Sequence, residues 1–281
     1  MKQFFNRILV FCIGSYINLL SFIYPKKAKE IAYTFFSTPR NGKLNQEKLP
    51  EILKNASFEF FKLENHSFPV YVWQGNATKI FLVHGWESNA SRWEPLINQI
   101  QKSGSTIIAL DGPAHGLSNG TEFNVPKYAS FINVAVKHFE PIFIIGHSIG
   151  GAACLYHHYF YKPESIKKLI LIGAPSDLDV LLFNFNKILG LNTRVSKLLE
   201  KHFEEKFNIK TAEFSGATMA SSLSISGIVA HDREDDVVSF KEGQKIISGW
   251  KNARFIETKG LGHSMHDEKL YLEIYKFLFE E

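Results

Sequence analysis

The sequence predicts an α/β protein in which helices cover a mostly parallel β-sheet. From about Phe58 onward, short apolar runs bounded by Gly, Pro, Asn and Asp alternate with longer amphipathic stretches, as in repeated strand and helix units. Several short runs, such as residues 80–83 and 169–172, are almost continuously apolar, which is typical of strands buried on both faces. A Gly-x-Ser-x-Gly sequence at residues 146–150 separates one such run from a helical pattern. The three observations indicate the same layered architecture.

Composition excludes several other classes of protein. The chain has 281 residues, of which 45% are hydrophobic and 21% charged. These values are typical of globular proteins and exclude disordered, collagen-like and multi-span membrane proteins. The 32 basic and 28 acidic residues give a net charge of +4, and because the charges are dispersed we expect no nucleic-acid partner. Cys12 and Cys154 are expected to be small buried side chains rather than a disulfide.

Residues 1–57 are predicted to form an N-terminal helical segment. Residues 8–24 are nearly all apolar and have basic residues on both sides. One interpretation is an amphipathic helix that packs on the domain or lies on a membrane surface. The other is a membrane anchor, although the run is short for a span of ~20 residues and contains Ser15, Asn18 and Ser21. We expect a cytoplasmic protein, with an anchor at residues 8–24 as the alternative. A second helix is expected at residues 28–36, before Pro39.

The core is predicted to comprise residues 58–175 and 225–281. Period-2 and continuous apolar runs predict strands at residues 58–63, 70–73, 80–83, 106–110, 142–145, 169–172, 225–230 and 254–257. Longer amphipathic stretches predict helices at residues 92–102, 125–139, 149–161, 240–249 and 268–279. The first two strands are expected to be an antiparallel pair.

Residues 176–224 interrupt this alternation with a helical block. Apolar residues recur at helical spacing from Leu178 to Leu189, Gly190 follows as a stop signal, and a second periodic run begins at Val195. We interpret the block as a small helical cap. The alternative is a peripheral helix pair with no role in substrate selection.

Ser148 is the candidate nucleophile. It lies at the centre of the Gly146–Gly150 motif, between a predicted strand and a predicted helix. That context is typical of a nucleophile elbow, a sharp turn that exposes the serine oxygen above the sheet. An oxyanion hole would need two backbone N–H donors. We expect them at Ile149, which follows the serine, and at Trp86, in the His-Gly-Trp turn after the strand at residues 80–83.

A serine nucleophile needs a histidine base and a carboxylate that orients it. His263 is the candidate base because it follows the last predicted strand. His231 is interpreted as the end of a strand, His266 as part of a helix start, and His157 and His158 as solvated helix residues. The acidic loop after residue 230 offers several candidates for the acid, and we place Asp235 first, Asp232 second and Asp236 third. His263 and His266 lack further ligands at metal-site spacing, so no metal is expected.

These motifs, in this order, resemble the α/β-hydrolase superfamily, in its serine-nucleophile, esterase- and lipase-like branch. The resemblance covers about residues 58–281. It implies an α/β-hydrolase fold with a mostly parallel eight-stranded sheet flanked by helices, and a helical cap between strands six and seven. It also implies a catalytic triad of Ser148, Asp235 and His263, with oxyanion donors at Trp86 and Ile149. Two positions depart from the family pattern, Ala114 in the Asp111–Ser118 turn and Ser239 after the acidic loop.

The expected function is therefore that of a serine esterase, a hydrolase that cleaves a carboxylic ester or related acyl substrate through an acyl-enzyme. A serine nucleophile disfavours dehalogenase and epoxide hydrolase reactions, which in this superfamily use aspartate. The apolar cap suggests a hydrophobic small-molecule acyl substrate. Acyl transfer, C–C bond hydrolysis and a non-catalytic binding role remain as alternatives, because a shared fold does not define function. No cofactor is expected, and peripheral membrane association through the N-terminal segment is left open.

Overall fold

The computed structural model describes residues 2–208, 210–211 and 214–280. The chain divides into two compact units. The helical unit comprises Met1–Thr38 and Asp177–Ser215, and the sheet unit comprises Pro39–Ser176 and Gly216–Glu281. Most of the block predicted at residues 176–224 thus shares a unit with the N-terminal helices, while residues 39–57 belong to the sheet unit. The function of that block as a cap stays a prediction.

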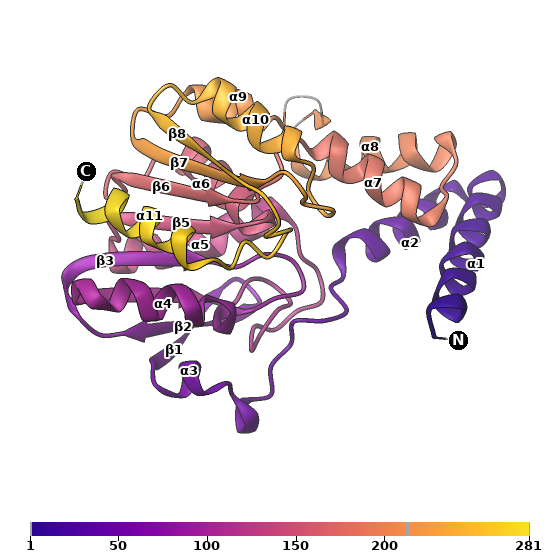
Figure 1. The fold of residues 1–281 in the computed structure, drawn as a ribbon. Coiled ribbons are helices and arrows are strands. Elements are labelled where there is room, and N and C mark those ends of the chain that lie inside the picture. Colours follow the sequence, from indigo (N-terminus) through magenta and orange to yellow (C-terminus); the bar gives the residue numbers. More distant parts are fainter. Residues whose placement is uncertain (1, 209, 212–213, 281) are drawn as a thin grey trace. The chain divides into compact units, whose positions relative to one another are not determined.

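One sheet of eight strands forms the centre of the sheet unit, in the order β1-β2-β4-β3-β5-β6-β7-β8 (Figure 1). β2 pairs antiparallel with β1 and β4, and all other neighbours are parallel. This confirms the prediction of a mostly parallel eight-stranded sheet with an antiparallel pair at its start. The strands are β1 (Ser57–Leu63), β2 (His66–Trp73), β3 (Asn76–Val83), β4 (Ser105–Leu110), β5 (Phe143–His147), β6 (Lys168–Ile172), β7 (Ser226–Asp232) and β8 (Ala253–Thr258).

Helices cover both faces of the sheet, with α4 and α11 in front and α5 and α6 behind in the view of Figure 1. Alternate residues of the strands, such as the fully buried Ile80 and Leu82 of β3, pack with α4 and α11 in one hydrophobic core. Side-chain caps set two helix starts, because Asn124 and Asp267 each accept a backbone N–H three residues ahead. The helices are α3 (Glu51–Lys54), α4 (Glu94–Ile100), α5 (Val125–Phe139), α6 (Ile149–Tyr161), α9 (Gly216–Ser221), α10 (Phe240–Gly249) and α11 (Glu268–Phe279).

Adjacent parallel strands bring the functional motifs to one edge of the sheet. In the register of β3 and β5, Val83 lies beside Gly146. The turns that follow both strands therefore begin at the same edge, where parallel α/β sheets bind their ligands.

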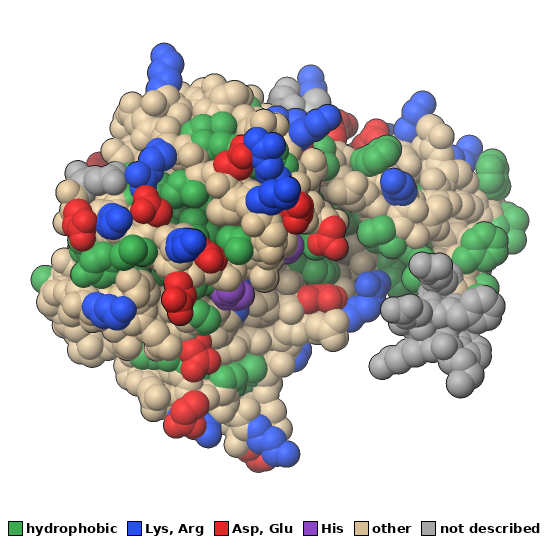
Figure 2. All heavy atoms as spheres, viewed as in Figure 1, with side chains coloured by type: hydrophobic (Ala, Val, Ile, Leu, Met, Phe, Trp, Pro, Cys, Tyr) green, Lys and Arg blue, Asp and Glu red, His purple; other side chains and the backbone are tan. Residues whose placement is uncertain are grey.

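Basic and acidic side chains are interspersed over the face of the molecule that Figure 2 shows, in agreement with the dispersed charge of the sequence.

The helical unit consists of α1 (Lys2–Ile23), α2 (Pro25–Ser37), α7 (Leu178–Leu189) and α8 (Thr193–Phe207). Its own core is built from buried apolar side chains of all four helices. Gly190 ends α7 with φ of 61°, as the sequence predicted. A Cβ atom on Gly14 would lie 1.7 Å from the carbonyl oxygen of Leu189, so this crossing of α1 and α7 requires glycine.

The two cysteines have different environments. Cys154 is buried in α6, as predicted, but Cys12 is exposed on α1, so the prediction of burial was wrong there. The apolar sequence around Cys12 does not reveal which side of the helix packs inward.

Within residues 2–208, 210–211 and 214–280, no helix is long and apolar enough to cross a membrane.

We expect Leu82→Ala to lower the free energy of unfolding of the sheet unit by about 2–5 kcal/mol, because the side chain is fully buried in β3. All four tryptophans, at positions 73, 86, 93 and 250, belong to this unit, so urea unfolding followed by tryptophan fluorescence reports on it. Leu272→Ala in α11, where the side chain is 43% exposed, is the matched control and should change stability by less than about 0.5 kcal/mol. Equal effects of the two variants would contradict this assignment of the core.

Candidate active site

Ser148 lies in a strained turn between β5 and α6. β5 ends at His147, α6 begins at Ile149, and Ser148 between them has φ of 54° and ψ of −131°. Such positive φ values are costly for residues other than glycine and persist only where the surroundings enforce them. Two glycines make room, because a Cβ on Gly146 would lie 2.6 Å from the Cα of Gly151, and one on Gly150 would lie 2.2 Å from the carbonyl oxygen of His84.

The structure brings Ser148, His263 and Asp235 into one hydrogen-bonded chain. His263 Nε2 lies 2.9 Å from Ser148 Oγ, and His263 Nδ1 lies 2.8 Å from Asp235 Oδ2. A carboxylate only accepts hydrogen bonds, so Nδ1–H donates to Asp235 and Nε2 is left to accept the Ser148 hydroxyl proton. Residues from three separate segments of the chain thus meet with the geometry that a nucleophile and its base require.

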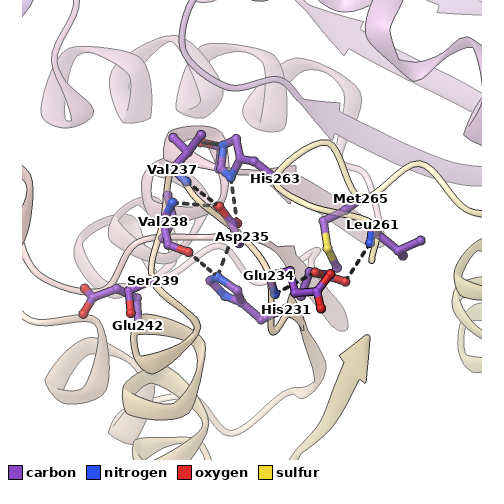
Figure 3. Close-up of polar contacts among 12 residues, drawn as sticks. His231, Glu234, Asp235, Val237, Val238, Ser239, Glu242, Leu261, His263 and Met265 are labelled. Carbon is purple, nitrogen blue, oxygen red and sulfur yellow. Dashed lines mark hydrogen bonds and ion pairs between the residues drawn. The ribbon is translucent and has the colours of Figure 1, made fainter. Parts of the chain in front are cut away.

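The carboxylate of Asp235 is buried and held by several donors (Figure 3). Its Oδ1 accepts the backbone N–H groups of Val237 and Val238, at 2.9 and 2.8 Å. Burial alone would raise the pKa of Asp235, but hydrogen bonds from His231, His263 and Val238 outweigh that effect and hold the pKa well below its usual value. Asp235 is therefore negatively charged at neutral pH beside His263.

The other two candidate acids lie elsewhere. Asp232 accepts the Thr258 hydroxyl at 2.7 Å and the N–H groups of Glu234 and Leu261 at 2.9 and 3.0 Å. It therefore ties the acidic loop to the loop that carries His263. Asp236 is exposed. Of the three candidates, Asp235 is the one that contacts His263, and its spacing from Val238 reflects the hydrogen bond between them. Its role as the acid stays a prediction.

The predicted oxyanion loop passes directly beside Ser148. A Cβ on Gly85 would lie 2.8 Å from Ser148 Cβ, so only glycine fits there. Ile149 is the first residue of α6, and N–H groups in the first turn of a helix have no partner within the helix. The loop itself is fixed by His84, whose Nε2 accepts the Gly112 N–H at 2.8 Å. The neighbouring Trp86 indole packs at ring-centroid distances of 5.6 Å from His115 and 5.4 Å from Phe123.

Two positioning histidines were missed from the sequence. His147 precedes the nucleophile, and its Nε2 lies 2.8 Å from the backbone oxygen of His263, to which it donates. His231 is the last residue but one of β7, which ends at Asp232 and not at His231 as expected. Its Nε2 donates to the Val238 carbonyl at 2.9 Å and lies 3.5 Å from Asp235 Oδ2. The sequence contains only weak indications of either role. His147 directly precedes Ser148, and His231 lies four residues before Asp235.

Two other expectations about histidines were wrong. His157 is fully buried rather than solvated, because its face of α6 packs inward. His266 lies before α11, whose cap is Asp267, and its ring contacts the Tyr271 hydroxyl.

In the part of the chain that the structure describes, no group of three or more His, Cys, Asp or Glu side chains is arranged to hold a metal ion.

Comparison with known proteins identifies the family of the chain. The family model for the alpha/beta hydrolase fold matches residues 78–224, more than half of the chain. The chain belongs to the α/β-hydrolase family. A bifunctional esterase/perhydrolase of Acinetobacter calcoaceticus is 22% identical to this α/β hydrolase over 240 residues, which cover 68% of this chain and 86% of that protein.

A monoglyceride lipase homolog of Monkeypox virus is 25% identical over 133 residues, covering 42% of this chain and 48% of that protein. The chain spans about half or less of the length of several curated relatives, this one included. A bromoperoxidase from Bacillus anthracis superimposes with a TM-score of 0.62 and 16% identity, over 79% of this chain and 99% of that chain. That structural similarity shows the fold.

We expect the stability of this α/β hydrolase to fall between pH 7 and pH 5. Burial lowers the pKa of four histidines, to about 4 for His115, to about 3 for His157, and well below the usual value for His84 and His147. The unfolded chain takes up these protons as the pH falls through about 6.5, whereas the folded chain does not. Each histidine that stays neutral at pH 5 should therefore cost up to about 2 kcal/mol of stability.

Urea unfolding at pH 7 and pH 5 measures this effect. His157→Leu should flatten the pH dependence, because it removes one buried neutral imidazole. The prediction fails if stability is the same at both pH values.

Proposed function

We propose that this protein is a serine hydrolase that cleaves a carboxylic ester or a related acyl compound. The observation that carries the proposal is the hydrogen-bonded chain from Ser148 through His263 to the buried carboxylate of Asp235, on a strained turn at the ligand-binding edge of the sheet. Nucleophile, base and orienting acid then have the roles of a catalytic triad.

The reaction would proceed in two halves. His263 Nε2 removes the hydroxyl proton as Ser148 Oγ attacks the carbonyl carbon, and the imidazolium is stabilised by Asp235. Backbone N–H groups of Trp86 and Ile149 stabilise the oxyanion of the tetrahedral intermediate. The C–O bond to the leaving group breaks, His263 gives its proton to the departing alcohol, and an acyl-enzyme remains. Water then attacks the acyl carbon with His263 as base, which releases the acid and restores Ser148.

An apolar acyl group is the substrate class that we propose. The partly exposed Trp86 follows Gly85, which adjoins Ser148, and packs against the buried Phe123. This aromatic surface beside the nucleophile supports a hydrophobic acyl or aryl group rather than a charged one. The names of the relatives, a monoglyceride lipase homolog and an esterase/perhydrolase, support ester chemistry.

Ser148→Ala should abolish labelling by a fluorophosphonate probe, which reacts only with an activated serine. Ester hydrolysis by Ser148→Ala or His263→Ala should fall to the residual level, about 10³–10⁴-fold above the uncatalysed reaction, that binding and oxyanion stabilisation provide. Mass spectrometry of the labelled chain and a screen of p-nitrophenyl esters graded by acyl length measure both outcomes. A folded wild-type protein that is neither labelled nor active would favour the non-catalytic binding role.

A separate experiment distinguishes hydrolysis from acyl transfer. Analysis of the reaction products with an added alcohol shows whether the acyl group goes to water or to the alcohol.

Asp235→Asn and Asp232→Asn are a matched pair, the same chemical change three residues apart. Asp235→Asn should lower kcat by about 10⁴-fold, because asparagine no longer selects the Nδ1–H tautomer of His263. Asp232→Asn should retain far more activity but lower the free energy of unfolding, because charge-assisted bonds to Thr258 and Leu261 weaken. Steady-state kinetics and urea unfolding of both variants test the pair. Full activity in Asp235→Asn together with its loss in a folded Asp232→Asn would transfer the role of acid to Asp232.

A further inference from the structure

The helical unit exposes a continuous apolar surface along α1. Apart from Ser15, every exposed residue from Ile8 to Tyr24 is apolar or aromatic. The exposed fractions reach 72% for Phe11, 64% for Leu19 and 67% for Phe22. Figure 2 shows hydrophobic side chains at the surface of this unit. We call this surface the α1 outer face, which comprises Ile8, Leu9, Phe11, Cys12, Tyr16, Leu19, Phe22, Ile23 and Tyr24.

The opposite side of α1 is fixed to the rest of its unit. Ile17 and Ser21 are fully buried. The Asn18 side chain donates to the Gly190 carbonyl and accepts the Asn192 N–H, both at 2.8 Å. Arg194 Nε donates to the carbonyl oxygen of Ser21 at 2.9 Å. Because Asn18 and Ser21 are bonded on this side, the helix is held in place and presents the outer face as a preformed surface.

Charge distinguishes α1 and its flanks from the rest of the chain. The first acidic residue of the sequence is Glu30, and five basic residues precede it. The first 29 residues therefore carry +5, and because the whole chain carries +4, the remaining 252 residues carry −1. The five basic residues are Lys2, Arg7, Lys26, Lys27 and Lys29. Lys27 and Lys29 lie within ion-pair distance of Glu30 and Glu205, contacts that contribute little at partly exposed positions.

We propose that the α1 outer face binds the surface of an anionic lipid bilayer, with α1 lying in the plane of the interface. An apolar helix face with aromatic side chains and flanking basic residues is the arrangement that inserts into the boundary between headgroups and acyl chains. The negative potential of anionic lipids attracts the basic residues at both ends of the helix. Among the nine residues of the α1 outer face, the polar side-chain groups are the hydroxyls of Tyr16 and Tyr24 and the weakly polar thiol of Cys12, which leaves little for the specific hydrogen bonding of a protein partner.

Pairing with a second copy of the chain fits the charges less well. Basic residues lie at both ends of α1, so two such helices would place like charges together in either a parallel or an antiparallel arrangement. A bilayer with anionic headgroups has the complementary charge along its whole surface.

Co-sedimentation of the purified full chain with lipid vesicles tests the proposal. The protein should bind vesicles of phosphatidylcholine mixed with phosphatidylglycerol, bind phosphatidylcholine alone more weakly, and dissociate progressively as salt is added. Leu19→Glu combined with Phe22→Glu should lower the partition coefficient about tenfold or more. Phe60→Glu combined with Phe160→Glu is the matched control, since these side chains of the sheet unit are 44% and 46% exposed, and it should bind as the wild type does.

Cys12 provides a measurement that needs no amino-acid substitution in the outer face. It is exposed on that face, whereas Cys154 is buried, so a thiol-reactive, polarity-sensitive fluorophore should label Cys12 alone. Its emission should shift to shorter wavelength with anionic vesicles, and Cys12→Ser should remain unlabelled. Ser148→Ala should bind vesicles as the wild type does, so this proposal and the proposed function can fail separately.

Three results would overturn the proposal. They are absence of wild-type binding to anionic vesicles, unchanged binding by the folded Leu19→Glu, Phe22→Glu variant, and an unshifted Cys12 emission. Analytical ultracentrifugation without lipid tests whether the α1 outer face instead pairs with a second copy of the chain. A dimer that this variant dissociates would assign the face to a second copy of the chain.

Discussion

The strained backbone at Ser148 is the constraint on which the rest of the candidate site depends. A serine with positive φ can persist only if both flanking elements are held firmly, and here they are the buried strand β5 and the helix α6. The turn also needs space, which Gly150 provides against the carbonyl oxygen of His84 and Gly85 provides against Ser148 itself. The strand order places β3 beside β5, so the strain at Ser148 and the close approach of the His84–Trp86 loop arise from one packing arrangement.

A second set of contacts fixes the loops that carry His263 and Asp235. Asp232 bonds to Thr258 at the end of β8 and to Leu261 in the loop before His263. His147 holds the backbone oxygen of His263 from the side of β5. These groups would act through His263 rather than on a substrate, and they explain how a residue on an exposed loop can keep one orientation.

The regular elements were predictable from the sequence because local signals define them. The ranges expected for α5, α6, α10 and α11 match the structure, since each combines an amphipathic period with a start or stop signal. The contact between Ser148 and His263 was also predictable, because each residue follows an apolar strand in a distinctive glycine context. The choice among Asp232, Asp235 and Asp236 was harder, because four acidic residues within five positions share the same local pattern. It depends on the pairing of β7 with β8, which brings Thr258 to Asp232.

The expectations that failed depend on contacts between distant segments. His157 is polar in sequence but lies on the side of α6 that packs inward, near Asn133 of α5. Cys12 lies in an apolar run, yet the approach of Gly14 to Leu189 turns the opposite side of α1 inward. A hydrophobic run indicates that a segment prefers to leave water, but not which partner covers it or whether that partner belongs to the same chain.

The buried histidines also shape the electrostatics of the proposed reaction. His147 and His263 have ring centroids 5.0 Å apart, so a charged His147 would oppose the proton that His263 must accept from Ser148. Burial, followed by the positive charge of Arg92, lowers the pKa of His147 well below its usual value and keeps that ring neutral. The carboxylate of Asp235 lies 2.8 Å from His263 Nδ1 on the other side, where it would stabilise the imidazolium of the proposed reaction. A neutral neighbour on one side and a buried anion on the other would thus favour the proton transfer of the proposed reaction.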